Sequence, residues 1–222
     1  MTLPPGPGPL MPLPPWGQIR DVLTEADRAL LLDWTLANRA RFAPSAVRFE
    51  GEFRIDPKAR VSERLGDLGP ARAMLGARLA ALLPDMLAAS GSRPFSPDYV
   101  ELELAAHGDG ACFRRHSDLP FGAARAAVGT EGKGGDRFDR LVSAVYYFHR
   151  EPKGFSGGAL RLHRFGGDGG GPGDRIDIEP VQNSLVVFPS WALHEVRPVS
   201  CPSGRFEDYR FAVNIWLCRA PG

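Results

Sequence analysis

The chain has 222 residues, of which 43% are hydrophobic and 24% are charged, the balance of a globular protein rather than a disordered or fibrous one. Its 27 lysines and arginines against 26 aspartates and glutamates give a net charge of +1, so a nucleic-acid partner is not expected. No stretch of the sequence contains the roughly 18 consecutive apolar residues of a membrane span, and a membrane partner is not expected either.

The first 16 residues are rich in proline and glycine, which predicts a flexible, extended arm. They lack the basic region and the unbroken apolar region of a signal peptide, so a cytoplasmic location is expected. The three cysteines, Cys112, Cys201 and Cys218, form no CxxC pair and are too few for a disulfide framework or a cysteine-based zinc site. We expect them to be free thiols.

A first helix is predicted over residues 24–41. Thr24 is a suitable N-cap, and Asp27 follows it three residues later, close to a capping-box arrangement. Leucines and Trp34 then recur at helical spacing, which favours packing of one helix face on a core.

A second helix is predicted to begin at Pro70, because proline is favoured in the first turn. One face of this helix would be apolar and is formed by Leu75, Leu79, Leu82 and Met86. Pro84 is expected to break or kink the helix, since it lacks a backbone N–H.

From residue 98 onward the pattern is typical of strands separated by glycine- and proline-rich turns. Alternating apolar residues predict strands at 99–106, 140–148, 157–163, 183–188 and 210–217. Helices followed by many short strands indicate an α+β fold with a sandwich, jelly roll or barrel. We expect one domain over residues 17–222, with helical support at 17–95 and the β core at 98–217.

Three separated residues form a candidate metal site. His116 and Asp118 stand two positions apart, so in an extended strand both side chains point to the same face. HxD alone is a weak signal, but His194, after a later strand and turn, would complete a set of two histidines and one carboxylate. That set occupies one triangular face of an octahedral metal and is typical of non-haem Fe(II) oxygenases.

Two strands supply candidates for binding an anion. Arg210 begins the strand at 210–217, and an inward-pointing arginine needs an anionic partner such as the carboxylate of a dicarboxylic acid. In the strand at 140–148, Leu141, Ser143, Val145 and Tyr147 share one face. If that face lines the pocket, Tyr147 can donate to the same carboxylate, and Ser143 is a second candidate for cofactor binding.

Taken in order, these pieces resemble the 2-oxoglutarate/Fe(II)-dependent dioxygenases, especially the hypoxia-sensing prolyl hydroxylases and their bacterial relatives. The resemblance spans roughly residues 100–217 and rests on the motifs HGDGACFRRHSD, RLVSAVYYF, GGALRL, SLVVFPS, HEVRPV and YRFAVNIW. It implies a double-stranded β-helix, or jelly roll, with N-terminal helices packed on one sheet.

The resemblance also implies roles for individual residues. His116, Asp118 and His194 would bind Fe(II), while Arg210 and Tyr147 would hold the far carboxylate of 2-oxoglutarate. Dioxygen is the other cosubstrate, and ascorbate is an optional cofactor. The implied reaction couples oxidative decarboxylation of 2-oxoglutarate to hydroxylation of a C–H bond, with a prolyl residue in a protein or peptide as the favoured substrate.

Some features depart from the family pattern. His107 stands near the place of a family tyrosine, where it either substitutes as a hydrogen-bond donor or makes no contact. Arg205 is an alternative to Arg210, which we prefer because it stands six residues before Trp216. The glycine-rich segment 119–139 is expected to form a lid rather than a disordered loop.

Three rival functions remain open from the sequence. A small-molecule oxygenase, acting on an amino acid or metabolite, would use the same residues. An alkylated-base demethylase would carry a second arginine where Trp216 stands. A non-catalytic jelly-roll binding module would have no need of Arg210 or Tyr147 beside the three metal-binding candidates.

Overall fold

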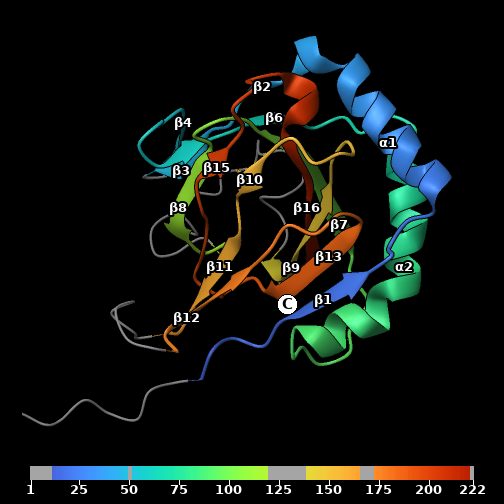
Figure 1. Cartoon of the computed structure of the whole chain (residues 1–222). Coiled ribbons are helices and arrows are strands. Elements are labelled where there is room, and N and C mark those ends of the chain that lie inside the picture. Colours follow the sequence, from blue (N-terminus) through green and yellow to red (C-terminus); the bar gives the residue numbers. More distant parts are fainter. Residues whose placement is uncertain (1–11, 50–51, 120–138, 166–172, 221–222) are drawn as a thin grey trace, which may run out of the picture.

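A computed structural model describes residues 12–49, 52–119, 139–165 and 173–220 (Figure 1). Two antiparallel sheets form the β part, and the helices α1 (Glu25–Ala37) and α2 (Ala71–Ala89) lie together on one side of the larger sheet. This arrangement agrees with the expected α+β class. Most of the proline-rich arm and nearly all of the predicted lid lie outside the described residues.

The larger sheet has seven strands, in the spatial order β1 (Gly17–Arg20), β13 (Ser184–Pro189), β9 (Asp139–Phe148), β16 (Arg210–Arg219), β7 (Tyr99–His107), β6 (Glu63–Leu65) and β2 (Ala43–Pro44). The smaller sheet has five, in the order β12 (Arg175–Ile178), β11 (Leu160–His163), β14 (His194–Val196), β8 (Cys112–His116) and β5 (Arg60–Val61). Two short ribbons complete the β structure and consist of β10 (Ser156–Gly157) with β15 (Val199–Ser200), and β3 (Val47–Phe49) with β4 (Glu52–Arg54).

Helix α1 begins where the sequence predicts, because Thr24 caps it. The Thr24 hydroxyl accepts a hydrogen bond from the backbone N–H of Asp27 at 3.2 Å. The helix ends at Ala37, before the predicted boundary, and a single 3₁₀ turn over Arg39–Arg41 follows. The short turn accounts for the helix-like pattern of the last predicted residues.

Helix α2 continues past Pro84, so of the two expected effects of this proline, a break or a kink, the break is wrong. Leu82, Met86 and Leu87 are buried on both sides of the proline, in the core between the helices and the large sheet. Burial of these side chains offsets the one hydrogen bond that the proline cannot make.

The large sheet separates two apolar clusters. On its outer face, Phe211, Val213 and Ile215 of β16 pack in the core shared with the helices. On its inner face, Ala212 of β16 joins Tyr147 and residues of the smaller sheet in a second cluster. The alternation of β16 therefore directs Arg210, which is in phase with Ala212, toward the space between the sheets.

The region predicted as helical support also contributes strands to both sheets. The strands β1, β2 and β6 join the large sheet and β5 joins the small one. They contain two to four residues each, too few for alternation to be visible in the sequence. The boundary expected near residue 98 is thus wrong for the edges of the sheets.

A β-bulge interrupts the pairing of β9 with β16. Ser143 pairs with Trp216 and Val142 with Leu217, but the next partner of Cys218 is Arg140. Leu141 is the extra residue, and it packs against the outer core rather than on the pocket face where alternation had placed it. Arg140 takes the inner face instead.

Candidate metal and cofactor site

Two adjacent strands of the small sheet bring the candidate metal ligands together. His116 ends β8, His194 begins β14, and the two are direct partners in the pairing of these strands. Asp118 follows β8, where its backbone N–H donates to the carbonyl of Ser190 at 3.1 Å. The ligand atoms of the three residues lie within 4.8 Å of one another, so they can hold one metal ion.

The hydrogen bonds of His116 and His194 use Nδ1 of each ring and leave each Nε2 available to bind a metal. Nδ1 of His116 lies 2.8 Å from the carbonyl oxygen of Arg114, and Nδ1 of His194 lies 2.9 Å from that of Ala192. A carbonyl oxygen only accepts, so each Nδ1 carries the proton and each Nε2 presents a lone pair. These Nε2 atoms lie 3.8 and 3.7 Å from the Asp118 carboxylate oxygens. Two imidazole nitrogens and one carboxylate suit Fe(II).

The carboxylate of Asp118 accepts a hydrogen bond from the hydroxyl of Ser143. Ser143 Oγ donates to Asp118 Oδ2 at 2.6 Å and shares a second hydrogen bond with Ser190 Oγ at 2.8 Å. Burial acts to raise the pKa of Asp118, but His194, the neighbouring positive groups and the Ser143 hydroxyl lower it overall. The structure therefore places Ser143 against a metal-binding candidate.

Arg210 begins β16, on the inner face of the large sheet, and is only 1% exposed. Its Cζ atom lies 4.7 Å from the centre of the Tyr147 ring. Nε of Arg210 and the hydroxyl of Tyr147 are buried and have no hydrogen-bond partner among the residues that the structure describes. Arg205, the alternative, is exposed at the surface and is bonded to Asp208.

These two unpaired groups fit a bound carboxylate. Burial lowers the pKa of Arg210, and the neighbouring Tyr147 hydroxyl acts in the opposite direction. A guanidinium remains charged in proteins, and among the described residues Arg210 forms no ion pair with a carboxylate. Burial also raises the pKa of Tyr147, which keeps its hydroxyl protonated as a donor. A positive group and a neutral donor at one buried point are complementary to the far carboxylate of 2-oxoglutarate.

His107 lies directly across from Arg210, its partner in the pairing of β7 with β16. Its Nδ1 atom is 3.1 Å from Arg210 Nη1. The contact that the structure shows for His107 is with the guanidinium, and its role as a substitute for the family tyrosine stays a prediction. The remaining histidines, His149 and His163, are buried outside the metal cluster.

Sequence reasoning did not identify the polar groups that border the metal site. Arg140, which the bulge turns inward, forms two-pronged hydrogen bonds with Glu101 and lies 3.9 Å above the ring of Trp216. The phase of β7 and β16 points Glu101 and Trp216 inward and could have indicated both residues. The position of Arg140 could not have been found in this way, because it depends on the bulge.

Arg60 is a second inward arginine that the sequence did not indicate. Its Nη2 donates to Glu103 at 3.0 Å, and its Cζ lies 4.9 Å from the centre of the Phe113 ring. Phe113 in turn stacks on His116 with ring centres 3.6 Å apart. Arg60 thus supports one side of the metal cluster through an aromatic ring.

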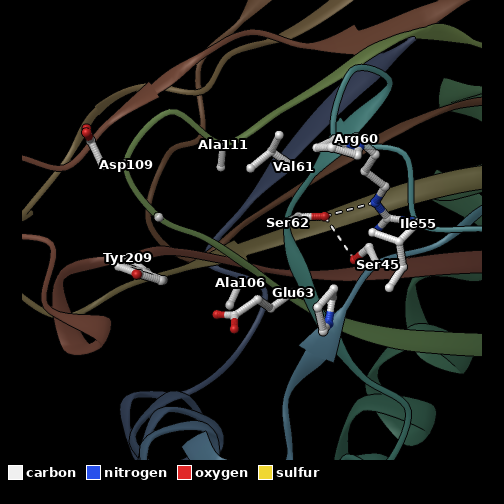
Figure 2. A pocket seen from close by; sticks show the side chains of 13 residues that line it. Ser45, Ile55, Arg60, Val61, Ser62, Glu63, Ala106, Asp109, Ala111 and Tyr209 are labelled. Carbon is white, nitrogen blue, oxygen red and sulfur yellow. Dashed lines mark hydrogen bonds between the residues drawn. The ribbon is translucent and has the colours of Figure 1, made fainter.

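A separate hollow of about 290 Å³ lies beside this edge (Figure 2). Arg60 donates from Nε to Ser62, and Ser62 donates to Ser45, both at 2.9 Å, along one wall. Tyr209 lines it from the chain segment that leads into Arg210. None of the three metal-binding candidates contributes to this hollow.

Comparisons with known proteins agree with this geometry. Residues 102–218 match the model of the 2OG-Fe(II) oxygenase superfamily. An uncharacterized PKHD-type hydroxylase from Synechocystis is 29% identical over 209 residues, which cover 91% of this chain. The chain spans 62% of the length of that relative.

Solved structures show the same fold. A prolyl-4-hydroxylase from Pseudomonas putida superposes with a TM-score of 0.60 and 24% identity, covering 93% of this chain and 94% of that one. A prolyl hydroxylase from Trichoplax adhaerens, solved with a hypoxia inducible factor peptide, gives a TM-score of 0.61 and 18% identity over 91% and 83% of the two chains.

The described part of the chain contains no helix that is both long and apolar enough to cross a membrane. The matched region includes the three metal-binding candidates, Arg210 and Tyr147. With more than half of its residues matched and its metal-binding candidates assembled at one point, the chain belongs to the 2OG-Fe(II) oxygenase superfamily.

Proposed function

We propose that this protein is an Fe(II)- and 2-oxoglutarate-dependent hydroxylase. The observation that carries the proposal is the buried guanidinium of Arg210, unpaired at Nε and beside the unpaired hydroxyl of Tyr147. A buried cation without an anion is unfavourable for the protein alone, and a dicarboxylic acid supplies the missing charge. A binding module that used only the metal cluster would not need this pair.

Each residue has a defined part in the proposed reaction. His116, Asp118 and His194 would hold Fe(II) on one face, and Arg210 with Tyr147 would fix the far carboxylate of 2-oxoglutarate. When bound, the metal supplies the redox chemistry by which 2-oxoglutarate and dioxygen yield succinate, carbon dioxide and a hydroxylated substrate.

Several groups support the metal ligands without touching the metal. The backbone carbonyls that bind each histidine Nδ1 keep both rings in the tautomer that metal binding requires. Ser143 would orient the Asp118 carboxylate rather than contact 2-oxoglutarate, since it donates to Oδ2.

We further propose a prolyl residue in a protein or peptide as the substrate. The names of the Pseudomonas putida and Trichoplax adhaerens enzymes support this substrate class. The alternative is a small-molecule oxygenase that acts on an amino acid or metabolite. We also propose that residues 17–222 form one domain whose two sheets make a double-stranded β-helix.

Succinate release from 2-oxoglutarate, measured with added Fe(II) and a panel of proline-containing peptides and free amino acids, tests the function. We expect the wild-type protein to release succinate and to add one oxygen atom to a peptide, which mass spectrometry detects. His116→Ala should abolish turnover, whereas His163→Gln, a matched change of a buried histidine outside the cluster, should not. Oxygen addition only to free amino acids would establish the small-molecule alternative.

Absence of iron-dependent turnover with every substrate, together with failure to bind 2-oxoglutarate, would contradict the proposal. It would instead support the non-catalytic binding module.

A further inference from the structure

The pair of His107 and Arg210 is excluded from water and fixed by strand pairing. His107 is 4% and Arg210 is 1% exposed, and the two residues are direct partners at the junction of β7 and β16. The 3.1 Å contact joins Nη1 of the guanidinium to Nδ1 of the imidazole. The described residues thus provide this buried cation with a ring nitrogen rather than a carboxylate.

The direction of this hydrogen bond fixes the imidazole tautomer. A guanidinium has five N–H donors and no acceptor, so Nδ1 of His107 must accept. The ring proton of neutral His107 therefore resides on Nε2. This tautomer is the opposite of that at His116 and His194, whose Nδ1 atoms face backbone carbonyls.

Two further contacts confine the guanidinium. The Tyr147 ring lies 4.7 Å from Cζ of Arg210. Gly158, with a φ of +72°, has no side chain, and a Cβ there would lie 2.6 Å from Arg210 Cδ and 3.0 Å from Nε. The arginine side chain therefore packs against the backbone of Gly158. In a planar guanidinium the N–H bond of Nε points away from Nη1, the atom that contacts His107. Nε has no hydrogen-bond partner among the described residues.

We propose that His107 is a positioning residue that accepts from Nη1 of Arg210 and so turns the Nε and Nη2 edge of the guanidinium toward the far carboxylate of 2-oxoglutarate. This inference rests on the proposed function of the same site. The Nε and Nη2 edge presents two parallel N–H bonds, which match the two oxygens of a carboxylate. The Tyr147 hydroxyl supplies a third donor.

The surroundings of His107 keep it able to accept. Burial, Arg210 and Arg60 lower the pKa of His107 well below its usual value, and a hydrogen bond with the backbone of Arg210 offsets this lowering only in part. The ring therefore remains neutral, and its Nδ1 lone pair stays available to Arg210. A protonated ring would have no acceptor and would repel the guanidinium.

A matched pair of variants of the full-length protein tests the proposal. In His107→Asn, the Oδ1 acceptor is the same number of bonds from the backbone as Nδ1 of histidine. In His107→Leu, the side chain has nearly the shape of asparagine but contains no hydrogen-bond acceptor. The probes are 2-oxoglutarate and 2-oxopentanoate, which lacks the far carboxylate, titrated calorimetrically into Mn(II)-loaded protein. We expect His107→Leu to bind 2-oxoglutarate about tenfold more weakly, and His107→Asn to stay close to wild type.

The second probe separates positioning from a merely structural role. Binding of 2-oxopentanoate should be equal in all three proteins, because it makes no use of Arg210. Equal weakening of both acids, or equal 2-oxoglutarate affinity in wild type and His107→Leu, would overturn the proposal. If His107→Leu does not fold, His107→Gln replaces it, since its acceptor lies one bond further out and should not restore binding.

The tautomer gives a readout that needs no metal or activity. Nitrogen-15 chemical shifts of the imidazole in the metal-free protein should show His107 protonated at Nε2. Protonation at Nδ1 would contradict the inference directly. Failure of the wild-type protein to bind 2-oxoglutarate at all, with the Nε2 tautomer present, would instead count against the proposed function.

Discussion

The two faces of the seven-stranded sheet differ sharply although the same strands build both. On the outer face, apolar side chains such as Phe211 and Val213 are fully buried against the helices. On the inner face, Arg210 and Tyr147 are just as buried but keep polar atoms without partners among the described residues. Under the proposed function, stability and ligand recognition are separated by the two-residue period of a strand, and substitutions on the two faces should affect different quantities.

The largest effect on stability is expected from the outer face. Phe211→Ala removes a fully buried ring that stacks near Phe148 and should lower the free energy of unfolding by about 3–5 kcal/mol. Urea unfolding measures this change. The 2-oxoglutarate affinity of the folded fraction should stay the same, and a selective loss of binding with full stability would break the distinction between the faces.

The inner face should respond in the opposite way. Arg210→Met should weaken 2-oxoglutarate binding by about a hundredfold or more, because the charge-assisted hydrogen bonds to the carboxylate are lost. The same variant should raise the free energy of unfolding of the metal-free protein, since a buried cation without an anion is removed. Calorimetric titration and urea unfolding check the two effects, and a parallel loss of both would refute the contrast.

Ser143→Ala tests whether the hydroxyl on Asp118 acts on the metal. Loss of the 2.6 Å hydrogen bond should weaken Mn(II) binding by about 10- to 100-fold with a small change in melting temperature. Ser184→Ala, which removes another fully buried hydroxyl of the same sheet, is the control and should leave metal affinity unchanged. Equal metal affinity in the two variants would remove Ser143 from the site.

Gly158 and Gly110 offer a comparison at equal backbone strain. Both have a φ of +72°, but a Cβ at Gly110 meets nothing within 4 Å, whereas one at Gly158 collides with Arg210. Each change to alanine should cost about 1 kcal/mol of stability through the left-handed backbone. Only Gly158→Ala should also weaken 2-oxoglutarate binding, and a similar weakening in Gly110→Ala would show that strain alone is responsible.

The last comparison concerns the pH dependence of stability. Because the folded-state pKa of His107 is lowered, the unfolded chain takes up a proton below about pH 6.5 while the folded chain does not. The contribution of His107 to stability therefore falls as pH decreases from 6.5. Relative to wild type, His107→Asn should reduce the slope of unfolding free energy against pH by up to about 1.4 kcal/mol per pH unit. Unfolding curves at several pH values between 5 and 7 measure the slope.

The parts of the site that follow from alternation were predictable from the sequence. The phase of β16 places Arg210 on the inner face, and the phase of β9 places Tyr147 beside it. The HxD spacing likewise brought His116 and Asp118 to one point, although Asp118 lies just beyond the strand. These residues could be predicted from the sequence because their positions depend on local periodicity.

Other parts depend on contacts between distant segments and could not be read locally. Arg60 reaches the site from a two-residue strand that exists only because it pairs with β8. Ser190 lies in a turn 73 residues after Ser117, whose hydroxyl donates to the Ser190 carbonyl. The same carbonyl accepts from the backbone N–H of Asp118, and the Ser190 hydroxyl bonds to Ser143. Pro84 stays helical because the surrounding leucines are buried, a tertiary effect that overrides its local preference.

The extra residue at Leu141 adds an apolar side chain to the outer face of β9 without turning the rest of the strand over. Deleting it would leave Arg140 paired with Cys218 and facing Glu101 and Trp216, and the pairing from Val142 to Phe148 would keep its register. The outer core would lose one side chain, whereas the inner face would keep all of its residues. A one-residue change at this point therefore alters the packing of the core and spares the candidate site.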